Sequence, residues 1–385
     1  MRPLEGIRVL DLSRLLPGPF ATLVLADLGA TVDKVEDPDL GDYTRLGTPR
    51  VDGESVAFHA LNRGKRSLVL NLKAEGGASA LLRLVRSYDV LVDQFRPGVM
   101  DRLGIGHAAL LEANPRLVVC ALTGYGQTGP WRDRAGHDLN YLGRAGLLGL
   151  MGPEQGPPQL PSFQLADVGG AMWSVIGILA ALRERDLTGK GRVLDVSMTD
   201  SVVPFAIVTL AKLFGGELPA RGGEYVTGGI AAYNTYLTKD GEAVSLGALE
   251  PKFLQRFCGG AGIVFDPMAL VPGPHQGAMK AEFATAFASK TRAEWEQFGE
   301  LHDCCIEPVL RPDELFDDPQ LAARGVFIEV RGEGGKFREF RTPVTPRELE
   351  PAKAPARAEH TTAILRDGGF SESEIAALRA AHVVE

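Results

Sequence analysis

Cysteine is scarce in this sequence, and its four cysteines form no motif. Cys120 and Cys258 stand alone, whereas Cys304 and Cys305 are adjacent, so the chain has neither a CxxC pair nor the spacing of a disulfide framework. We therefore expect reduced thiols in a cytoplasmic protein. The adjacent pair is better explained by packing than by redox chemistry.

Long hydrophobic runs are also missing. The longest charge-free helical stretch, 168–182, is shorter than the roughly 20 residues that span a bilayer, so it predicts a buried helix and no membrane partner. The stretch "MRPLEGIRVLDLS" has no signal-peptide core. A net charge of −8 argues against nucleic acid as the main partner, and 45% hydrophobic and 23% charged residues are ordinary for a globular protein.

The common nucleotide-binding motifs are absent as well. No Walker sequence occurs, and no GxGxxG follows the first predicted strand. A nucleoside triphosphate and a dinucleotide cofactor are therefore both disfavoured.

What is present in the first part of the chain is a regular alternation of strand and helix patterns. Strands of this kind, separated by single helices, imply βαβ units and a parallel sheet covered by helices. The expected elements are strands at 7–13 and 31–36 with a helix at 19–30 between them, helix–strand repeats at 78–95 and 107–122, a long helix at 168–185, a strand at 191–198 and a helix at 200–214.

A glycine-rich linker at 215–225 separates this part from a different pattern. The stretch 233–249 predicts a β-hairpin that turns at Asp240-Gly241. Helices are expected at about 250–258, 279–289 and 291–302, and a loop-rich tail ends in a helix at 371–381. The fold class is therefore α/β: a large domain of residues 1–214, to which 325–385 return, and a smaller α+β domain of residues 225–315.

A basic segment is the first candidate binding site. Between residues 45 and 73 the positive charges exceed the negative ones by four. A solvated surface is the usual reason for such a cluster, but Arg and Lys also make charge-assisted bonds to phosphates. Two further arginines follow a predicted strand end, where ligands of open α/β sheets bind. The candidate phosphate contacts are Arg45, Lys65, Arg66, Lys73, Arg96 and Arg102.

Four acid/base side chains stand at the starts of predicted helices. Asp138, next to His137, could simply cap a helix at 138–150, and Asp167 could cap the long helix. Alternatively, His137 and Asp167 could face each other across a cavity, each near a positive helix end. Glu250, at a strand end, by itself indicates only the start of a helix.

Taken together, the motifs resemble the family III CoA-transferases, and within that superfamily the alpha-methylacyl-CoA racemases. The resemblance covers nearly the whole chain and is more specific than any single motif. It is carried by "LPGPFATLVLADLGATVDKVE", "NRGKRSLVLNLK", "FRPGVMDRLGIG", "LTGYGQTGP", "AGHDLNY", "LADVGG", "LTGKGRVLDVSMTD", "GALEPKF" and "CCIEPVL".

The resemblance implies a Rossmann-like large domain and an interlocked homodimer in which the small domain of one subunit completes the site of the other. It further implies that His137 and Asp167 are the acid/base pair, and that Glu250 supports the histidine. Tyr141, in the matched segment "AGHDLNY", is a candidate contact for the CoA thioester. The substrate is an acyl-CoA, and neither a metal nor a redox cofactor is expected.

Three functions follow as hypotheses. A racemase inverts the α-carbon of a 2-methylacyl-CoA by removing a proton on one face and returning one on the other. A transferase of the family would use Asp138 as a nucleophile, but it usually has an aromatic residue where this chain has His137. The segment "TPRVDGESVAFHALNRGKRS" is nevertheless longer than that of the racemases and resembles a transferase's, and "GGIAAYNTY" lacks the proline that the racemases carry there. A non-catalytic acyl-CoA-binding protein is the third hypothesis.

Overall fold

The computed structural model describes residues 2–332, 335–350 and 352–385, which form two compact units. The first unit combines the chain up to residue 144 with residues 164–202 and 319–385. The second unit contains residues 145–163 and 203–318. Each unit has its own hydrophobic core.

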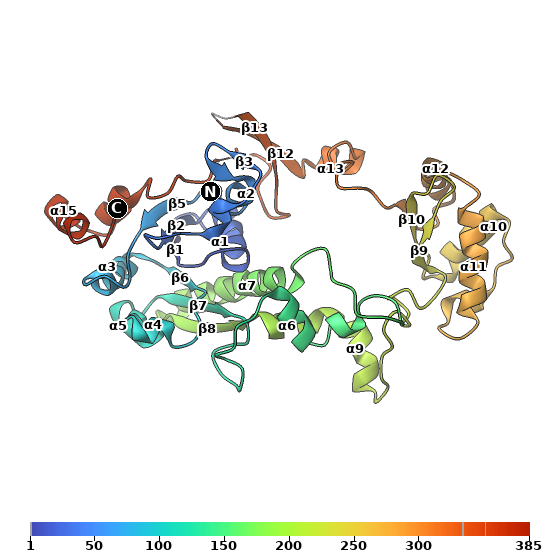
Figure 1. Cartoon of the computed structure of the whole chain (residues 1–385), viewed down its shortest axis with the longest axis horizontal. Helices are drawn as coiled ribbons and strands as arrows, with labels where there is room; N and C mark the ends of the chain where they lie inside the picture. The colour runs from blue at the N-terminus through green and yellow to red at the C-terminus, as the bar shows by residue number, and fades with distance from the viewer. Residues whose placement is uncertain (1, 333–334, 351) are drawn as a thin grey trace. The chain divides into compact units, whose positions relative to one another are not determined.

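The first unit is built on a six-stranded sheet in which all neighbouring strands are parallel, as the βαβ pattern predicts (Figure 1). In the strand order β5-β2-β1-β6-β7-β8, successive strands are added first on one side of β1 and then on the other, so the switch point lies between β1 and β6. Ligands of doubly wound sheets bind at the carboxyl ends of the strands near this point. The strands are β1 (Arg8–Asp11), β2 (Thr31–Glu36), β5 (Arg66–Val69), β6 (Val90–Asp93), β7 (Val118–Thr123) and β8 (Arg192–Ser197).

Helices cover both faces of this sheet because neighbouring residues of each strand point to opposite sides. Val9 belongs to the core beneath α1 (Pro17–Asp27) and α7 (Leu165–Thr188). Leu10, the next residue, belongs to the core on the other face. That face is covered by α3 (Gly77–Leu84), α5 (His107–Ala113), α14 (Thr361–Asp367) and α15 (Glu372–Ala380).

The long helix α7 extends three residues beyond its expected bounds at each end. Among the described residues, α7 is the one helix that is sufficiently long and apolar to cross a membrane. Half of its most apolar window is nevertheless buried inside the protein. Ala171, Val175 and Ile178 pack on the sheet. A core helix of a soluble domain shows the same combination.

The remainder of the first unit contains short elements that the sequence patterns did not all predict. The tail was expected to hold only loops before its last helix, but it also forms α13 (Pro319–Arg324), the antiparallel pair β12 (Phe327–Gly332) and β13 (Gly335–Phe340), and α14. The helix expected at 138–150 is shorter, because α6 spans only Asp138–Arg144. The other short elements are η1 (Tyr43–Leu46), β3 (Arg50–Val51), β4 (Glu54–Ser55), α2 (Val56–Asn62), η2 (Val85–Ser87), α4 (Val99–Arg102) and α8 (Met198–Val202).

The second unit is an α+β structure around a three-stranded antiparallel sheet. The expected hairpin is confirmed as β9 (Tyr233–Leu237) and β10 (Ala243–Gly247), and β11 (Ile306–Pro308) completes the sheet. Helix α12 begins with the predicted capping box of Thr291 and Glu294. Buried aromatic side chains fill the core between sheet and helices. Its helices are η3 (Leu148–Leu150), η4 (Val203–Ala206), α9 (Ile207–Phe214), α10 (Pro251–Ala261), η5 (Pro267–Leu270), α11 (Gln276–Phe287) and α12 (Arg292–His302).

Candidate active site

A cavity of about 760 Å³ opens at the carboxyl ends of the parallel strands and is lined entirely by residues of the first unit. Segments that follow different strands meet there, as the strand order predicts for a ligand site. These segments are Leu12–Leu15 after β1, 37–42 after β2, Leu70–Ala74 after β5, Gln94–Pro97 after β6, and Gly124 and Tyr125 after β7.

Five of the residues singled out from the sequence line this cavity together. His137, Tyr141 and Asp167 come from the start of α6 and the start of α7. Lys73 and Arg96 come from the loops after β5 and β6. The structure therefore brings a histidine, a carboxylic acid and two cations to one concave site, although they are far apart in the sequence.

His137 is held at the end of a fixed loop. Its backbone N–H donates to Asn140 Oδ1 at 3.0 Å, and its carbonyl accepts from the N–H of Asn140 at 2.8 Å. Tyr141 Oη donates to the carbonyl of Gly136 at 2.5 Å. A Cβ atom at Gly136 would lie 2.7 Å from the Tyr141 ring, so glycine is needed for this close approach. Tyr141 thus fixes the backbone that carries His137.

One sequence-based interpretation was that Asp138 caps its own helix. The structure shows a different arrangement. Asp138 is the first residue of α6, and its Oδ1 accepts from two N–H groups in the first turn of α7. The distances are 2.6 Å to the nitrogen of Ala166 and 3.1 Å to that of Asp167. Asp138 therefore satisfies backbone donors that α7 itself leaves unpaired.

Asp167 lies in the first turn of α7, half-buried on the cavity wall. Burial raises the pKa of its carboxyl group, and the negative charge of Asp138 raises it further, to about 7. Among the described residues, no cation forms an ion pair with Asp167 to offset these two effects. This carboxyl group can therefore both hold and release a proton near neutral pH.

Two of the expected phosphate contacts lie elsewhere, beneath the cavity. Lys65 is completely buried, and its Nζ donates to Asp11 at 3.1 Å and to Thr22 Oγ1 at 2.7 Å. Arg45 forms a bidentate ion pair with Glu36, with distances of 2.8 and 2.6 Å. Since these charges are paired inside the protein, their role in this structure is to hold segments together.

Arg66, Arg102 and Glu250 do not line the cavity either. Arg66 forms a bidentate pair with Asp33, at 2.6 and 2.8 Å, and contacts Asp367. Arg102 is exposed at the end of α4. Glu250 belongs to the second unit, where it is exposed at the N-cap position of α10.

Three cavity-lining arginines, Arg14, Arg132 and Arg134, were missed by the sequence analysis. Arg14 follows β1 closely, and the other two lie in the loop between β7 and α6. The rule that ligands bind after strand ends would have found Arg14, because it is three residues beyond Asp11. No group of three or more His, Cys, Asp or Glu side chains is arranged to hold a metal ion among the described residues.

The doubly wound sheet and the acid/base groups at its carboxyl edge define an α/β enzyme-like site. Residues 4–361 match the model of CoA-transferase family III, and the chain belongs to this family. It is 38% identical to the alpha-methylacyl-CoA racemase of Homo sapiens, over 99% of this chain and 97% of that protein.

Two further comparisons agree with this membership. The chain is 34% identical to a succinate–glutarate CoA-transferase of Agrobacterium fabrum, over 95% of both proteins. It also resembles the crystal structure of a CAIB/BAIF family protein from Brucella suis, with a TM-score of 0.82, 30% identity, and coverage of 95% of this chain and 99% of that one. Relatives with both kinds of activity are thus similar to this chain over almost its whole length.

Proposed function

We propose that this protein is an enzyme acting on CoA thioesters, and that it inverts the α-carbon of 2-methylacyl-CoA substrates. The observation that carries the proposal is the placement of three side chains. His137 and Asp167 both line the cavity, whereas the Oδ1 atom of Asp138 is occupied by the backbone of α7. The similarity to a racemase over 99% of the chain supports the same function.

The proposed reaction is a pair of proton transfers at the carbon next to the thioester carbonyl. One of the two groups, His137 or Asp167, removes the α-proton, and the other donates a proton to the opposite face. The roles exchange for the other enantiomer. Histidine side chains exchange protons near neutral pH, and the raised pKa of Asp167, about 7, brings a carboxylic acid into the same range.

The intermediate enolate requires hydrogen-bond donors near its oxygen. We propose that the backbone N–H at the start of α6, next to His137, supplies one of them. Lys73 and Arg96 are the two expected phosphate contacts that line the cavity, and we assign to them the binding of the CoA moiety. The proposed chemistry uses only these protein groups and requires no metal or redox cofactor.

A CoA-transferase is the second candidate function, favoured by the 34% identity to a succinate–glutarate CoA-transferase. In that case the Asp138 carboxylate would attack the thioester carbonyl, release CoA as a thiolate and form an acyl anhydride. CoA would then displace the acid and leave an aspartyl-CoA thioester. The carboxylate would have to give up its two backbone bonds or attack with its second oxygen.

The decisive experiment uses a single-enantiomer 2-methylacyl-CoA in deuterated water without an acceptor acid. A racemase incorporates deuterium at the α-carbon as optical purity is lost. A transferase leaves the α-proton in place and turns over only when an acceptor acid is added. Hydroxylamine would then trap an acyl group on wild-type Asp138 but not on the Asp138→Asn variant.

We also propose that the protein is a homodimer. Met172, Ile176 and Leu179 form an exposed apolar stripe at helical spacing on α7, on the side that does not pack on the sheet. In an interlocked dimer the exposed Glu250 of one subunit would support the His137 of the other. Light scattering combined with activity measurements tests this, because a fully active monomer would contradict it.

A further inference from the structure

Arg14 is a cation on the wall of the cavity. It lines the cavity in the loop between β1 and α1, and its side chain is exposed. Its guanidinium lies over the ring of Tyr43, 4.6 Å from the centroid, and donates to Tyr43 Oη at 3.0 Å. Among the described residues no carboxylate forms an ion pair with Arg14, so its charge faces the cavity without an internal anion.

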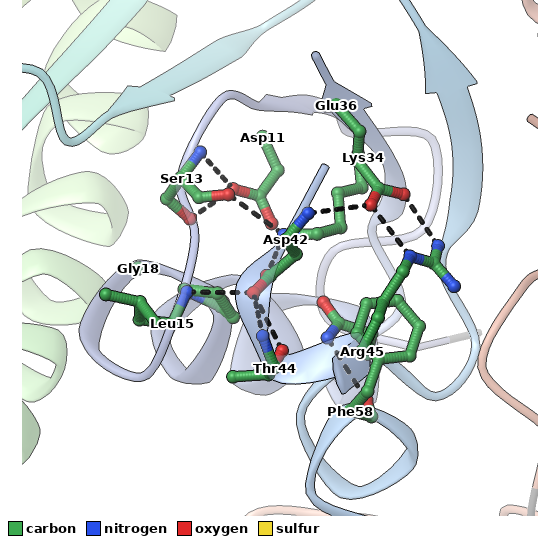
Figure 2. A network of polar contacts seen from close by, with 12 residues as sticks. Asp11, Ser13, Leu15, Gly18, Lys34, Glu36, Asp42, Thr44, Arg45 and Phe58 are labelled. Carbon is green, nitrogen blue, oxygen red and sulfur yellow. Dashed lines mark hydrogen bonds and ion pairs between the residues drawn. The ribbon is translucent and has the colours of Figure 1, made fainter. Parts of the chain in front are cut away.

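Hydrogen bonds hold the backbone of Ser13 and Leu15, the residues on both sides of Arg14 (Figure 2). Ser13 donates its N–H to Asp11 at 3.0 Å, and its carbonyl accepts from Lys34 Nζ at 2.9 Å. Leu15 donates its N–H to Asp42 Oδ1 at 3.1 Å. Leu15 also has a φ of 66°, a left-handed conformation that is unfavourable for leucine and persists only when neighbouring contacts impose it.

A balanced network of buried charges makes these contacts. Lys34 is almost completely buried, and its Nζ lies 2.8 Å from Asp42 Oδ2. Asp11 is paired with Lys65, and Glu36 with Arg45. Three buried carboxylates therefore face three buried cations. Lys34 links the β1–α1 loop, through the carbonyl of Ser13, to Asp42 in the segment after β2.

Four acidic side chains from the end of β2 and the segment after it also line the cavity. Glu36 and Asp42 are neutralised within the network. Asp37 accepts three N–H groups of its own turn through Oδ1, at 3.0 to 3.2 Å. Asp39 has no ion pair among the described residues, so it provides a charge of opposite sign for comparison.

We propose that Arg14 binds an anionic group of the ligand, and that Lys34 and Asp42 are positioning residues that set the β1–α1 loop for this contact. Arginine pairs with the oxygens of either a phosphate or a carboxylate. The anion is therefore a phosphate of the CoA moiety or a carboxylate at the end of the acyl chain. This inference rests on the proposed function only in taking a CoA thioester as the ligand.

The first test measures the Kd of three ligands by calorimetry: CoA, butyryl-CoA and glutaryl-CoA. We expect Arg14→Gln to raise the Kd of at least one of these ligands by about fivefold. This is the upper end of the range of effects for removing a partly exposed ion pair. An equal increase for all three ligands identifies a phosphate, and an increase for glutaryl-CoA alone identifies the acyl carboxylate. Asp39→Asn should shift the same Kd in the opposite direction.

The matched control is Arg86→Gln, which removes an exposed positive charge outside the cavity. If Arg14→Gln changes no Kd more than this control does, the proposal is overturned. Calorimetric binding does not depend on turnover. A protein that binds through Arg14 but fails to racemise would refute the proposed function and leave this inference standing.

The second test separates positioning from mere stability. Lys34→Met should reproduce the loss of affinity seen for Arg14→Gln, and the double variant should bind no more weakly than Arg14→Gln alone. A Lys34→Met variant that unfolds more easily but binds as wild type would contradict the positioning role. If this variant does not fold, Lys34→Met/Asp42→Asn, which leaves no unpaired buried charge, replaces it with the same expected outcome.

Discussion

Two carboxylates of the first unit, Asp11 and Asp167, have pKa values that are shifted in opposite directions. Burial acts to raise the pKa of both. At Asp11 burial is the largest single effect, but the charges of Lys65 and Lys34 and the hydrogen bonds from Ser13 and Thr22 together outweigh it, so the pKa falls to about 2. At Asp167 burial and the charge of Asp138 both act to raise the pKa, which rises to about 7.

The environments of Asp11 and Asp167 therefore suit different roles. Beneath the loops after β1 and β2, charges are paired, and a group such as Asp11 stays ionised and holds the backbone in place. At the start of α7, a carboxyl group is left unpaired and can change its protonation state near neutral pH. A proton carrier needs the second environment, and a rigid binding wall needs the first.

The largest expected effect comes from breaking the paired side. Lys65→Met should lower the free energy of unfolding by about 3–5 kcal/mol, because it leaves Asp11 buried without its cation. Urea denaturation measures this. Lys73→Met provides the control, since Lys73 is exposed and has no ion pair among the described residues. If the two variants are equally stable, the buried pair does not have the role assigned to it.

The next largest effect concerns the unpaired side. His137→Ala and Asp167→Ala should each reduce the rate of racemisation by about 100-fold or more, which is the usual scale for a positioned acid or base. Steady-state polarimetry of a chiral substrate measures the rate. Neither variant should unfold at a lower denaturant concentration than the wild type. Rates within about tenfold of wild type would remove these residues from the proposed chemistry.

A smaller effect on stability follows from the raised pKa of Asp167. A carboxyl group whose pKa is raised on folding, here from 3.8 to about 7, contributes stability that is fully present below pH 3.8 and is lost as the pH rises through 7. Asp167→Asn should therefore be more stable than wild type at pH 8, by about 2 kcal/mol, roughly half of the full linkage value because Asp167 is only half-buried, and equally stable at acidic pH. Chemical denaturation at several pH values measures this difference in the free energy of unfolding. A difference that does not depend on pH would contradict the prediction.

The smallest effect is expected at Asp138. Asp138→Asn keeps an oxygen that can accept from α7 but removes the negative charge next to Asp167. Activity should therefore be largely retained, and the rise in rate that reports ionisation of Asp167 should move to lower pH. A pH–rate profile measures the shift. Complete loss of turnover would instead favour Asp138 as a nucleophile.

Much of the sheet could be predicted from the sequence, because its signals are local. The strand at 31–36 was predicted with its observed bounds, and the capping box of Thr291 and Glu294 was recognised from two residues. The pair β12–β13 was missed, although β13 alternates exposed and buried residues from Lys336 to Glu339. That pattern lies in a tail whose other residues give weak signals.

The candidate site could be predicted only in part. The helix-start positions of His137 and Asp167 are visible in the sequence, and their acid/base role was predicted from the resemblance to the family. The sequence does not show whether a basic side chain is paired inside the protein or free to bind a ligand. Lys65 and Lys73 lie eight residues apart, yet the first is buried against Asp11 and the second lines the cavity. Which of two lysines finds an internal carboxylate depends on strand pairing across the sheet, and local sequence does not encode that.

The most direct test of the central claim follows α-proton exchange in deuterated water, enantiomer by enantiomer, in His137→Ala and Asp167→Ala. Each variant keeps one proton carrier. If the two groups act as a pair of bases, each variant exchanges the α-proton of only one enantiomer, the two variants prefer opposite enantiomers, and neither inverts the carbon. Exchange that survives in the double variant His137→Ala/Asp167→Ala would contradict this mechanism.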